Sequence, residues 1–121
     1  MMDQRDNAFS GDNLGWRLET IVMIHLIRKC RIEGLDLYYY SDNSGECDFI
    51  LCKGDKTLQA IQVSYDISKE KTRNRELKGL HIAAEATKCD NLLLLTDHNR
   101  EVVEENGHTI RIQPVYEWCL E

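Results

Sequence analysis

Proline and glycine are scarce in this sequence, whose 121 residues include one proline and seven glycines. No stretch has the composition of a flexible linker, and no internal repeat or low-complexity tract is present. The pattern therefore excludes a repeat array and a disordered chain. We expect a loose polar arm over residues 1–13 and one domain over residues 14–121, a length that suffices for a single hydrophobic core.

Long apolar runs are also missing. The longest, Ile21–Ile27, is interrupted by His25, whereas a membrane-spanning helix needs about 20 apolar residues. The first residues, MMDQRDNAFSGDN, have neither the basic start nor the apolar segment of a secretory signal peptide. We expect a cytoplasmic protein without membrane contact.

Several chemical motifs are absent. The five cysteines include no C-x-x-C pair, which favours reduced thiols in the core. A zinc site built from Cys47, Cys52 and a histidine is a minority alternative, because an odd separation places the two thiols on opposite faces of a strand. The four histidines have no metal-ligand spacing; we expect His81 to pack in a helix and His98 and His108 to lie in loops. No G-x-x-x-x-G-K-[ST] run occurs, so we expect no ATP site in this chain.

Basic residues are outnumbered, with 15 Lys and Arg against 21 Asp and Glu and a formal net charge of −6. An acidic domain binds a phosphate backbone poorly unless its bases are segregated or a metal ion assists. Residues 53–80 hold seven bases against four acids, a local charge of +3. This segment keeps DNA among the expected partners, although a solvated helix face is the simpler explanation.

The sequence does contain clear helical and strand patterns. Periodicity, turn residues and capping signals predict a series of elements, with Asn13 and Ser68 as helix N-caps. In chain order they are a helix over Leu14–Arg31, strands over Leu35–Ser41, Glu46–Cys52 and Thr57–Tyr65, a helix over Ser68–Thr87, strands over Asn91–Thr96, Glu101–Glu104 and Thr109–Ile112, and a short helix opened by Pro114.

The fold class that this order predicts is α/β. The first three strands read as an antiparallel meander. The unbroken leucines of Asn91–Thr96 are typical of a parallel strand covered on both faces, so we expect that strand at the centre of the sheet. The result is an α-β-β-β-α-β core, a mixed sheet flanked by helices, with a C-terminal β-hairpin and a short helix added.

Glu19 is a charged residue on an apolar face of the first helix. At 100° per residue, its neighbours within about 60° are Trp16, Val22, Met23, Leu26 and Cys30. An unpartnered buried carboxylate costs on the order of several kcal/mol. We therefore expect Glu19 to be protonated, ion-paired or bound to a metal ion. The alternative to a functional role is a structural ion pair or an acid favoured by the helix dipole.

Asp48 and Gln62 interrupt the apolar patterns of two expected neighbouring strands. If the two strands pair as a hairpin, their register can place Asp48 beside Gln62 on one face of the sheet. With Glu19 they would form an oxygen-rich pocket of the kind that hard cations such as Mg²⁺ accept.

The chain resembles the domain of unknown function found at the C-terminus of prokaryotic AAA-type ATP-binding proteins. That domain is similar to the PD-(D/E)XK nucleases, which include restriction endonucleases and archaeal-type Holliday junction resolvases. The fragments that carry the resemblance, in this order, are GWRLETIV (15–22), YYY (38–40), ECDFI (46–50), IQVSYD (61–66), NLLLLT (91–96) and YEW (116–118).

The resemblance implies a restriction-endonuclease-like fold with a degenerate active site. Glu19 matches the acid of the first helix and Asp48 the metal-binding Asp, while Gln62 and Ser64 stand at the Glu and Lys of the (D/E)XK element. In active members the acids hold Mg²⁺ and the Lys stabilises developing charge. Gln62 offers a carbonyl oxygen without charge, and Ser64 cannot replace an ammonium. Glu19, Asp48 and Gln62 remain the candidate metal ligands.

We therefore expect a non-catalytic interaction or nucleic-acid-sensing module. The candidate DNA contacts are Lys69, Lys71, Arg73 and Arg75. A separate ATPase subunit or a second copy of the chain is a further expected partner. One alternative is a weak Mg²⁺-dependent DNA endonuclease that uses Glu19 and Asp48; another is a purely structural or oligomerising domain. Convergence of Glu19, Asp48 and Gln62 on one open site would argue against the last.

Overall fold

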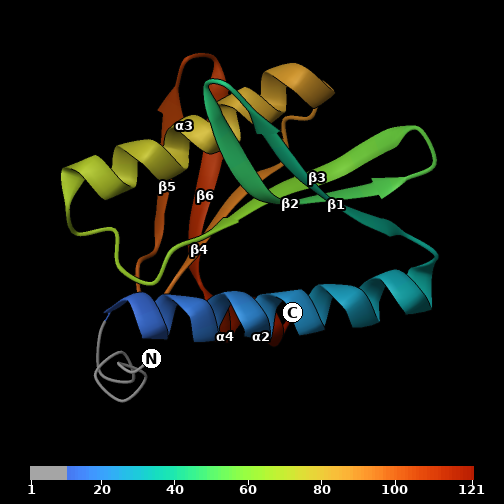
Figure 1. The fold of residues 1–121 in the computed structure, drawn as a ribbon, viewed down its shortest axis with the longest axis horizontal. Helices are drawn as coiled ribbons and strands as arrows, with labels where there is room; N and C mark the ends of the chain where they lie inside the picture. Colours follow the sequence, from blue (N-terminus) through green and yellow to red (C-terminus); the bar gives the residue numbers. More distant parts are fainter. Residues whose placement is uncertain (1–10) are drawn as a thin grey trace.

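The computed structural model describes residues 11–121. These residues form a mixed six-stranded sheet with helices on both faces (Figure 1). The order of the elements is the predicted one, which confirms the α/β class. The elements are α2 (Gly11–Glu33), β1 (Asp36–Asp42), β2 (Gly45–Lys53), β3 (Lys56–Val63), α3 (Glu70–Thr87), β4 (Leu92–Thr96), β5 (Glu101–Glu105), β6 (His108–Pro114) and α4 (Val115–Cys119).

The strands lie side by side in the order β1-β2-β3-β4-β6-β5. The first three form the predicted antiparallel meander. β4 is parallel to both of its neighbours, β3 and β6, and every residue of it is buried. The prediction of a central parallel strand is confirmed. β5 and β6 form the predicted antiparallel hairpin.

The hydrophobic core has two layers, one on each face of the sheet. α3 covers one face, and α2 and α4 cover the other (Figure 1). The leucines of β4 show why both layers are needed: Leu92 and Leu94 pack on the α3 side, while Leu93 and Leu95 pack on the α2 side. Alternating strand side chains thus tie the two layers to one sheet.

Both predicted helix caps are wrong. Asn13 lies inside α2, which already includes Gly11, and residues 1–10 of the predicted arm lie outside the described residues. Ser68 precedes the cap of α3, which is Lys69 and has no side-chain cap hydrogen bond. The Ser68 N–H donates to Asp66 Oδ1 at 2.8 Å, in a local turn that precedes the helix. A local turn has taken the polar side chains that would have capped the helix.

Two further expectations are also wrong, one about side-chain direction and one about secondary structure. Cys47 and Cys52 are buried in the same cluster under α3, because the β1–β2 register shifts between the pairs Tyr38↔Ile50 and Tyr40↔Cys47. Such a bulge reverses the alternation from which opposite faces were expected. His108, expected in a loop, is the first residue of β6. Among residues 11–121, no helix combines the length and apolarity needed to cross a membrane.

Candidate functional site

The site forms where two neighbouring strands part. β2 and β3 are paired from Lys53↔Lys56 up to Phe49↔Ile61, and beyond that point β3 continues beside β4 alone. Asp48 and Gln62 are the next residues on each strand, so neither has a ladder partner across the gap. Backbone groups that lose ladder partners inside a protein need others.

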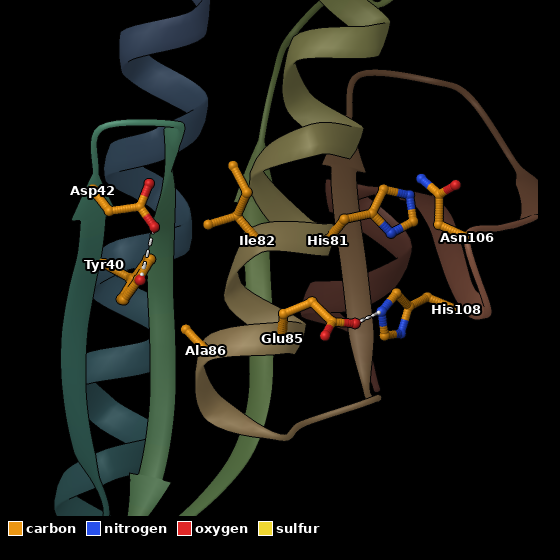
Figure 2. A pocket seen from close by; sticks show the side chains of 8 residues that line it. All are labelled: Tyr40, Asp42, His81, Ile82, Glu85, Ala86, Asn106 and His108. Carbon is orange, nitrogen blue, oxygen red and sulfur yellow. Dashed lines mark hydrogen bonds and ion pairs between the residues drawn. The ribbon is translucent and has the colours of Figure 1, made fainter.

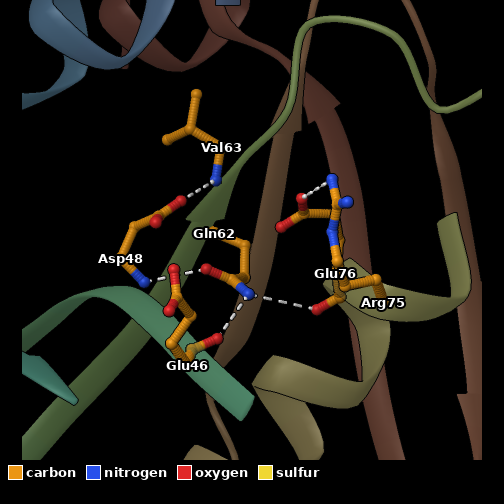
Figure 3. A network of polar contacts seen from close by, with 6 residues as sticks. All are labelled: Glu46, Asp48, Gln62, Val63, Arg75 and Glu76. Atoms are coloured by element: carbon orange, nitrogen blue, oxygen red, sulfur yellow. Dashed lines mark hydrogen bonds and ion pairs between the residues drawn. The ribbon is translucent and has the colours of Figure 1, made fainter. Parts of the chain in front are cut away.

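Gln62 and Asp48 supply those partners with their side chains, as Figure 3 shows. The Asp48 N–H donates to Gln62 Oε1 at 2.8 Å, and the Val63 N–H donates to Asp48 Oδ2 at 3.0 Å. Gln62 Nε2 donates to the carbonyl oxygens of Glu46 at 2.9 Å and Glu76 at 3.4 Å. The predicted proximity of Asp48 and Gln62 is confirmed, and the amide of Gln62 joins β2, β3 and α3.

Gly79 of α3 permits this arrangement. A Cβ built at Gly79 would approach Gln62 Nε2 and the Glu46 carbonyl oxygen more closely than real Cβ atoms come to such atoms. The helix therefore needs a residue without a side chain where it crosses the bridge.

A cavity of about 790 Å³ opens above this network between α2, α3 and the start of β2. Glu19, Asp48 and Gln62 all line it, so the three residues converge as the sequence predicted. Ser64 does not line it; the Ser64 N–H is bonded to the Leu95 carbonyl oxygen at 2.9 Å. The complete lining is Glu19, Ser44, Gly45, Glu46, Asp48, Gln62, Val63, Lys71, Asn74, Arg75, Glu76 and Lys78.

Glu19 reaches the cavity from the border of the buried face of α2 and not from its middle. Val22 and Leu26 are fully buried, but Trp16 and Met23, which were expected beside them, are exposed. Apolar residues surround most of α2, so periodicity alone could not select the buried side. Glu19 is consequently only half-buried, and its environment does not require the partner that full burial would demand.

Negative charge accumulates on the floor of the cavity. The pKa of Asp48 is raised to about 7: burial is the largest cause, the charges of Glu19, Glu76 and Glu46 act in the same direction, and the hydrogen bond from the Val63 N–H opposes them. Burial also raises the pKa of Glu76, although the adjacent Arg75 opposes the shift. Carboxylates that repel one another in this way are stabilised by any cation that enters.

Glu76 is the carboxylate that sequence reasoning missed. Its side chain is 13% exposed, and it forms an ion pair with Arg75 at 3.3 Å. The signal was available, since Glu76 precedes the buried Leu80 by four residues and so lies on the same face of α3. The criterion that singled out Glu19 in the first helix also applies to Glu76 in the second.

The predicted basic residues divide into two groups. Lys71 and Arg75 line the cavity, together with Lys78, which was not predicted. Arg73 points elsewhere: its guanidinium binds both carboxylate oxygens of Glu101 on β5, each at 2.8 Å. Lys69 is the N-cap of α3 and does not line the cavity.

A second cavity, of about 520 Å³, lies along α3 between Tyr40 and Asp42 of β1 and Asn106 and His108 of the β5–β6 hairpin (Figure 2). Two histidine–carboxylate pairs connect the helix to the hairpin here: His81 Nε2 to Glu105 at 2.8 Å and His108 Nε2 to Glu85 at 2.9 Å. The predicted packing of His81 in the helix is confirmed. Because both pairs join α3 to the hairpin, their plainest role is to hold these two elements together.

The main cavity has the chemistry of a cation site with an incomplete ligand set. Glu19, Glu46, Asp48 and Glu76 line it, and carboxylates are the ligands that a hard divalent ion prefers. Gln62 Oε1 already accepts the Asp48 N–H. In the part of the chain that the structure describes, no three His, Cys, Asp or Glu side chains are grouped closely enough to hold a metal ion. Buried Cys47, whose thiol pKa burial raises to about 12, stays protonated in the core.

Comparison with known proteins places the chain in a family. It is 32% identical over 114 residues to "Uncharacterized protein MJ1544" of Methanocaldococcus jannaschii. The match covers 89% of this chain and 25% of that protein, so the chain spans about a quarter of the relative's length. The family described as "Domain of unknown function (DUF4143)" matches residues 14–117, from α2 to α4. The chain therefore belongs to the DUF4143 family.

Proposed function

We propose that this chain is a nuclease-fold domain with a degenerate active site that acts as a non-catalytic nucleic-acid-sensing module. The bonding of Gln62 carries the proposal. Its amide is committed to three main-chain groups at the position where the resembled nucleases have a metal-binding carboxylate. With Ser64 outside the cavity, a bound Mg²⁺ would lack both that carboxylate and the ammonium that stabilises developing charge.

A row of bases along α3 supports nucleic acid as the ligand. Lys71, Arg75 and Lys78 are exposed at the rim of the cavity and lie on one line of the helix, being four and seven residues apart. At 1.5 Å per residue, Lys71 and Lys78 are about 10 Å apart along the axis, the length of about three phosphates of one strand. The basic side chains of the row lie at the solvent edge of the cavity, and the carboxylates lie on its floor.

Binding of a fluorescein-labelled four-way junction and of a matched linear duplex, followed by anisotropy, tests this proposal. We expect Lys71→Ala combined with Lys78→Ala to weaken binding about tenfold or more and to reduce the salt dependence by about two phosphate contacts. Arg73→Ala is the matched control on the same helix, because Glu101 already neutralises Arg73. Equal losses in both variants, or no binding by the wild type, would refute the role of the row.

Cleavage assays address the loss of catalysis. We expect no nick in supercoiled plasmid or junction DNA with Mg²⁺ or Mn²⁺, for the wild type and for Asp48→Ala alike. Metal-dependent nicking that disappears in Asp48→Ala would replace this proposal with the alternative below.

The alternative is a weak Mg²⁺-dependent DNA endonuclease that uses Glu19 and Asp48. One observation favours it: Glu76 lines the same cavity from α3 and adds a largely buried carboxylate to Glu19 and Asp48, whereas Gln62 has none. This enzyme would lose activity in Glu76→Ala as well as in Asp48→Ala. If a folded Gln62→Glu, Ser64→Lys double variant gained neither metal binding nor cleavage, the assignment of this cavity as the remnant of a nuclease site would fail.

A purely structural or oligomerising role is the weakest of the three readings. Glu19, Asp48 and Gln62 line one open cavity, whereas a structural ion pair would seal Glu19 against a base. We also propose association with a separate AAA-type ATPase subunit. The family resemblance is the only support for this partner. Co-elution of the purified chain with such a subunit is its test.

A further inference from the structure

α2 carries a row of apolar side chains that faces away from the domain. Trp16, Met23, Ile24 and Ile27, the α2 stripe, are 65%, 40%, 47% and 38% exposed. Met23, Ile24 and Ile27 follow Trp16 by seven, eight and eleven residues. At helical spacing, the four side chains form one band along the helix. Contiguous apolar bands of this kind mark interaction sites more often than singly scattered residues do.

The α2 stripe contributes little to the folding of this domain. The helix is attached to the sheet by Val22 and Leu26, with Leu18 packed beside them. At 100° per residue, the centre of this buried face lies about 140° from the centre of the stripe. A helix that only had to cover the sheet would be polar there.

Arginines border the stripe on one side. Arg17 and Arg28 lie next to Ile24 around the helix, and Arg31 follows Ile27 by one turn; all three are exposed. None of them forms an ion pair with any residue among 11–121, whereas Lys29 on the same helix binds Glu33 at 3.1 Å. Unpaired guanidinium groups beside an apolar band select a partner with carboxylates at matching positions.

We propose that the α2 stripe docks an amphipathic helix of another polypeptide, whose apolar face is bordered by Asp or Glu. A second copy of this chain fits less well. An antiparallel two-fold pair of α2 helices would set the arginine border against itself, and the other border of the stripe offers Glu19 as its carboxylate. This surface is separate from the rim of α3 and does not depend on the proposed nucleic-acid function.

The test uses the full chain and two labelled synthetic helical peptides. The peptides share one leucine band and differ in carrying Glu or Lys beside it. We expect the Glu peptide to bind about tenfold more tightly than the Lys peptide, measured by anisotropy. Ile24→Glu should weaken its binding about tenfold. Ile32→Glu is the matched control, since Ile32 is 83% exposed and lies off the stripe. Circular dichroism verifies the fold of both variants.

Several results would overturn the proposal. Equal affinity for the two peptides would remove the role of the arginines, and binding of neither would remove the site. An equal loss in Ile32→Glu would show that the stripe is not the contact surface. A dimer of the wild type that Ile24→Glu dissociates would assign the stripe to a second copy, and Ile24-dependent binding to anionic phospholipid vesicles would assign it to a membrane surface.

Discussion

Gln62 shows how one side chain can replace a stretch of β-ladder. β2 and β3 separate at this residue, and its amide satisfies an N–H of β2 and carbonyl oxygens of β2 and α3. Its closeness to Asp48 could be predicted because both residues interrupt apolar strands. The hydrogen bonds of both polar atoms of the amide could not be predicted, because they depend on where α3 crosses the sheet.

Removing this amide should be costly. We expect Gln62→Ala to lower the free energy of unfolding by about 2–4 kcal/mol, because the buried Asp48 N–H and Glu46 carbonyl lose their partners. Gln59→Ala on the same strand is the control: its amide makes one exposed contact of 3.4 Å with Asn91, and its loss should cost about 0.5 kcal/mol or less. Urea unfolding measures both, and similar values for the two variants would contradict the bridging role.

At the scale of elements, local signals predicted the order and type of every helix and strand in the described chain. They did not predict which face of α2 is buried, because Trp16, Ile21, Met23, Ile24 and Ile27 leave no clearly polar side. The caps also failed: α2 begins before Asn13, and Ser68 lies in a local turn in which its N–H donates to Asp66. Features that depend on contacts between elements, such as the buried face of a helix, could therefore not be predicted from sequence patterns.

The contact between α3 and the β2–β3 gap gives an element-scale prediction. Gly79→Ala should destabilise the protein by about 1–3 kcal/mol, although alanine is the better helix former, because its Cβ would collide with the Gln62 amide and the Glu46 carbonyl.

Gly15→Ala in α2 is the matched substitution. A Cβ at Gly15 would meet Tyr65 Cβ at 3.9 Å, an ordinary contact, so helix propensity should decide and raise stability by up to about 1 kcal/mol. Opposite signs in thermal unfolding are the expected result. Stabilisation by both substitutions would show that α3 does not approach the bridge this closely.

At the scale of the whole molecule, charge is distributed unevenly between surfaces. The chain is acidic as a whole, yet α3 presents bases at the cavity rim and α2 presents exposed arginines beside its apolar stripe. The local excess of basic residues over residues 53–80 was visible in the sequence. The pairing of Arg73 with Glu101 was not, because it joins residues that are far apart in the chain.

The buried carboxylates make global stability depend on pH in a direction opposite to that of most acidic groups. The pKa of Asp48 is about 7 in the folded protein and 3.8 ordinarily, so the folded state holds the proton more tightly. Its contribution is fully present below about pH 4 and is lost as the pH rises through about 7. Asp48→Asn keeps an oxygen for the Val63 N–H but cannot ionise. We expect the variant to gain stability over the wild type with rising pH, by up to about 4 kcal/mol at pH 8.

Urea unfolding in EDTA at pH 4, 6 and 8 measures this gain, because chelation removes any cation that would otherwise stabilise the ionised carboxylate. Asp66→Asn provides a control of opposite sign. The Ser68 N–H lowers the pKa of exposed Asp66, so its contribution is present at neutral pH and is lost as the pH falls below about 4. A stability difference between Asp48→Asn and the wild type that stays constant from pH 4 to 8 would mean that Asp48 is already ionised in the folded protein at pH 4. The cavity floor would then be hydrated well enough to hold several negative charges, and the drive to bind a cation there would be correspondingly weak.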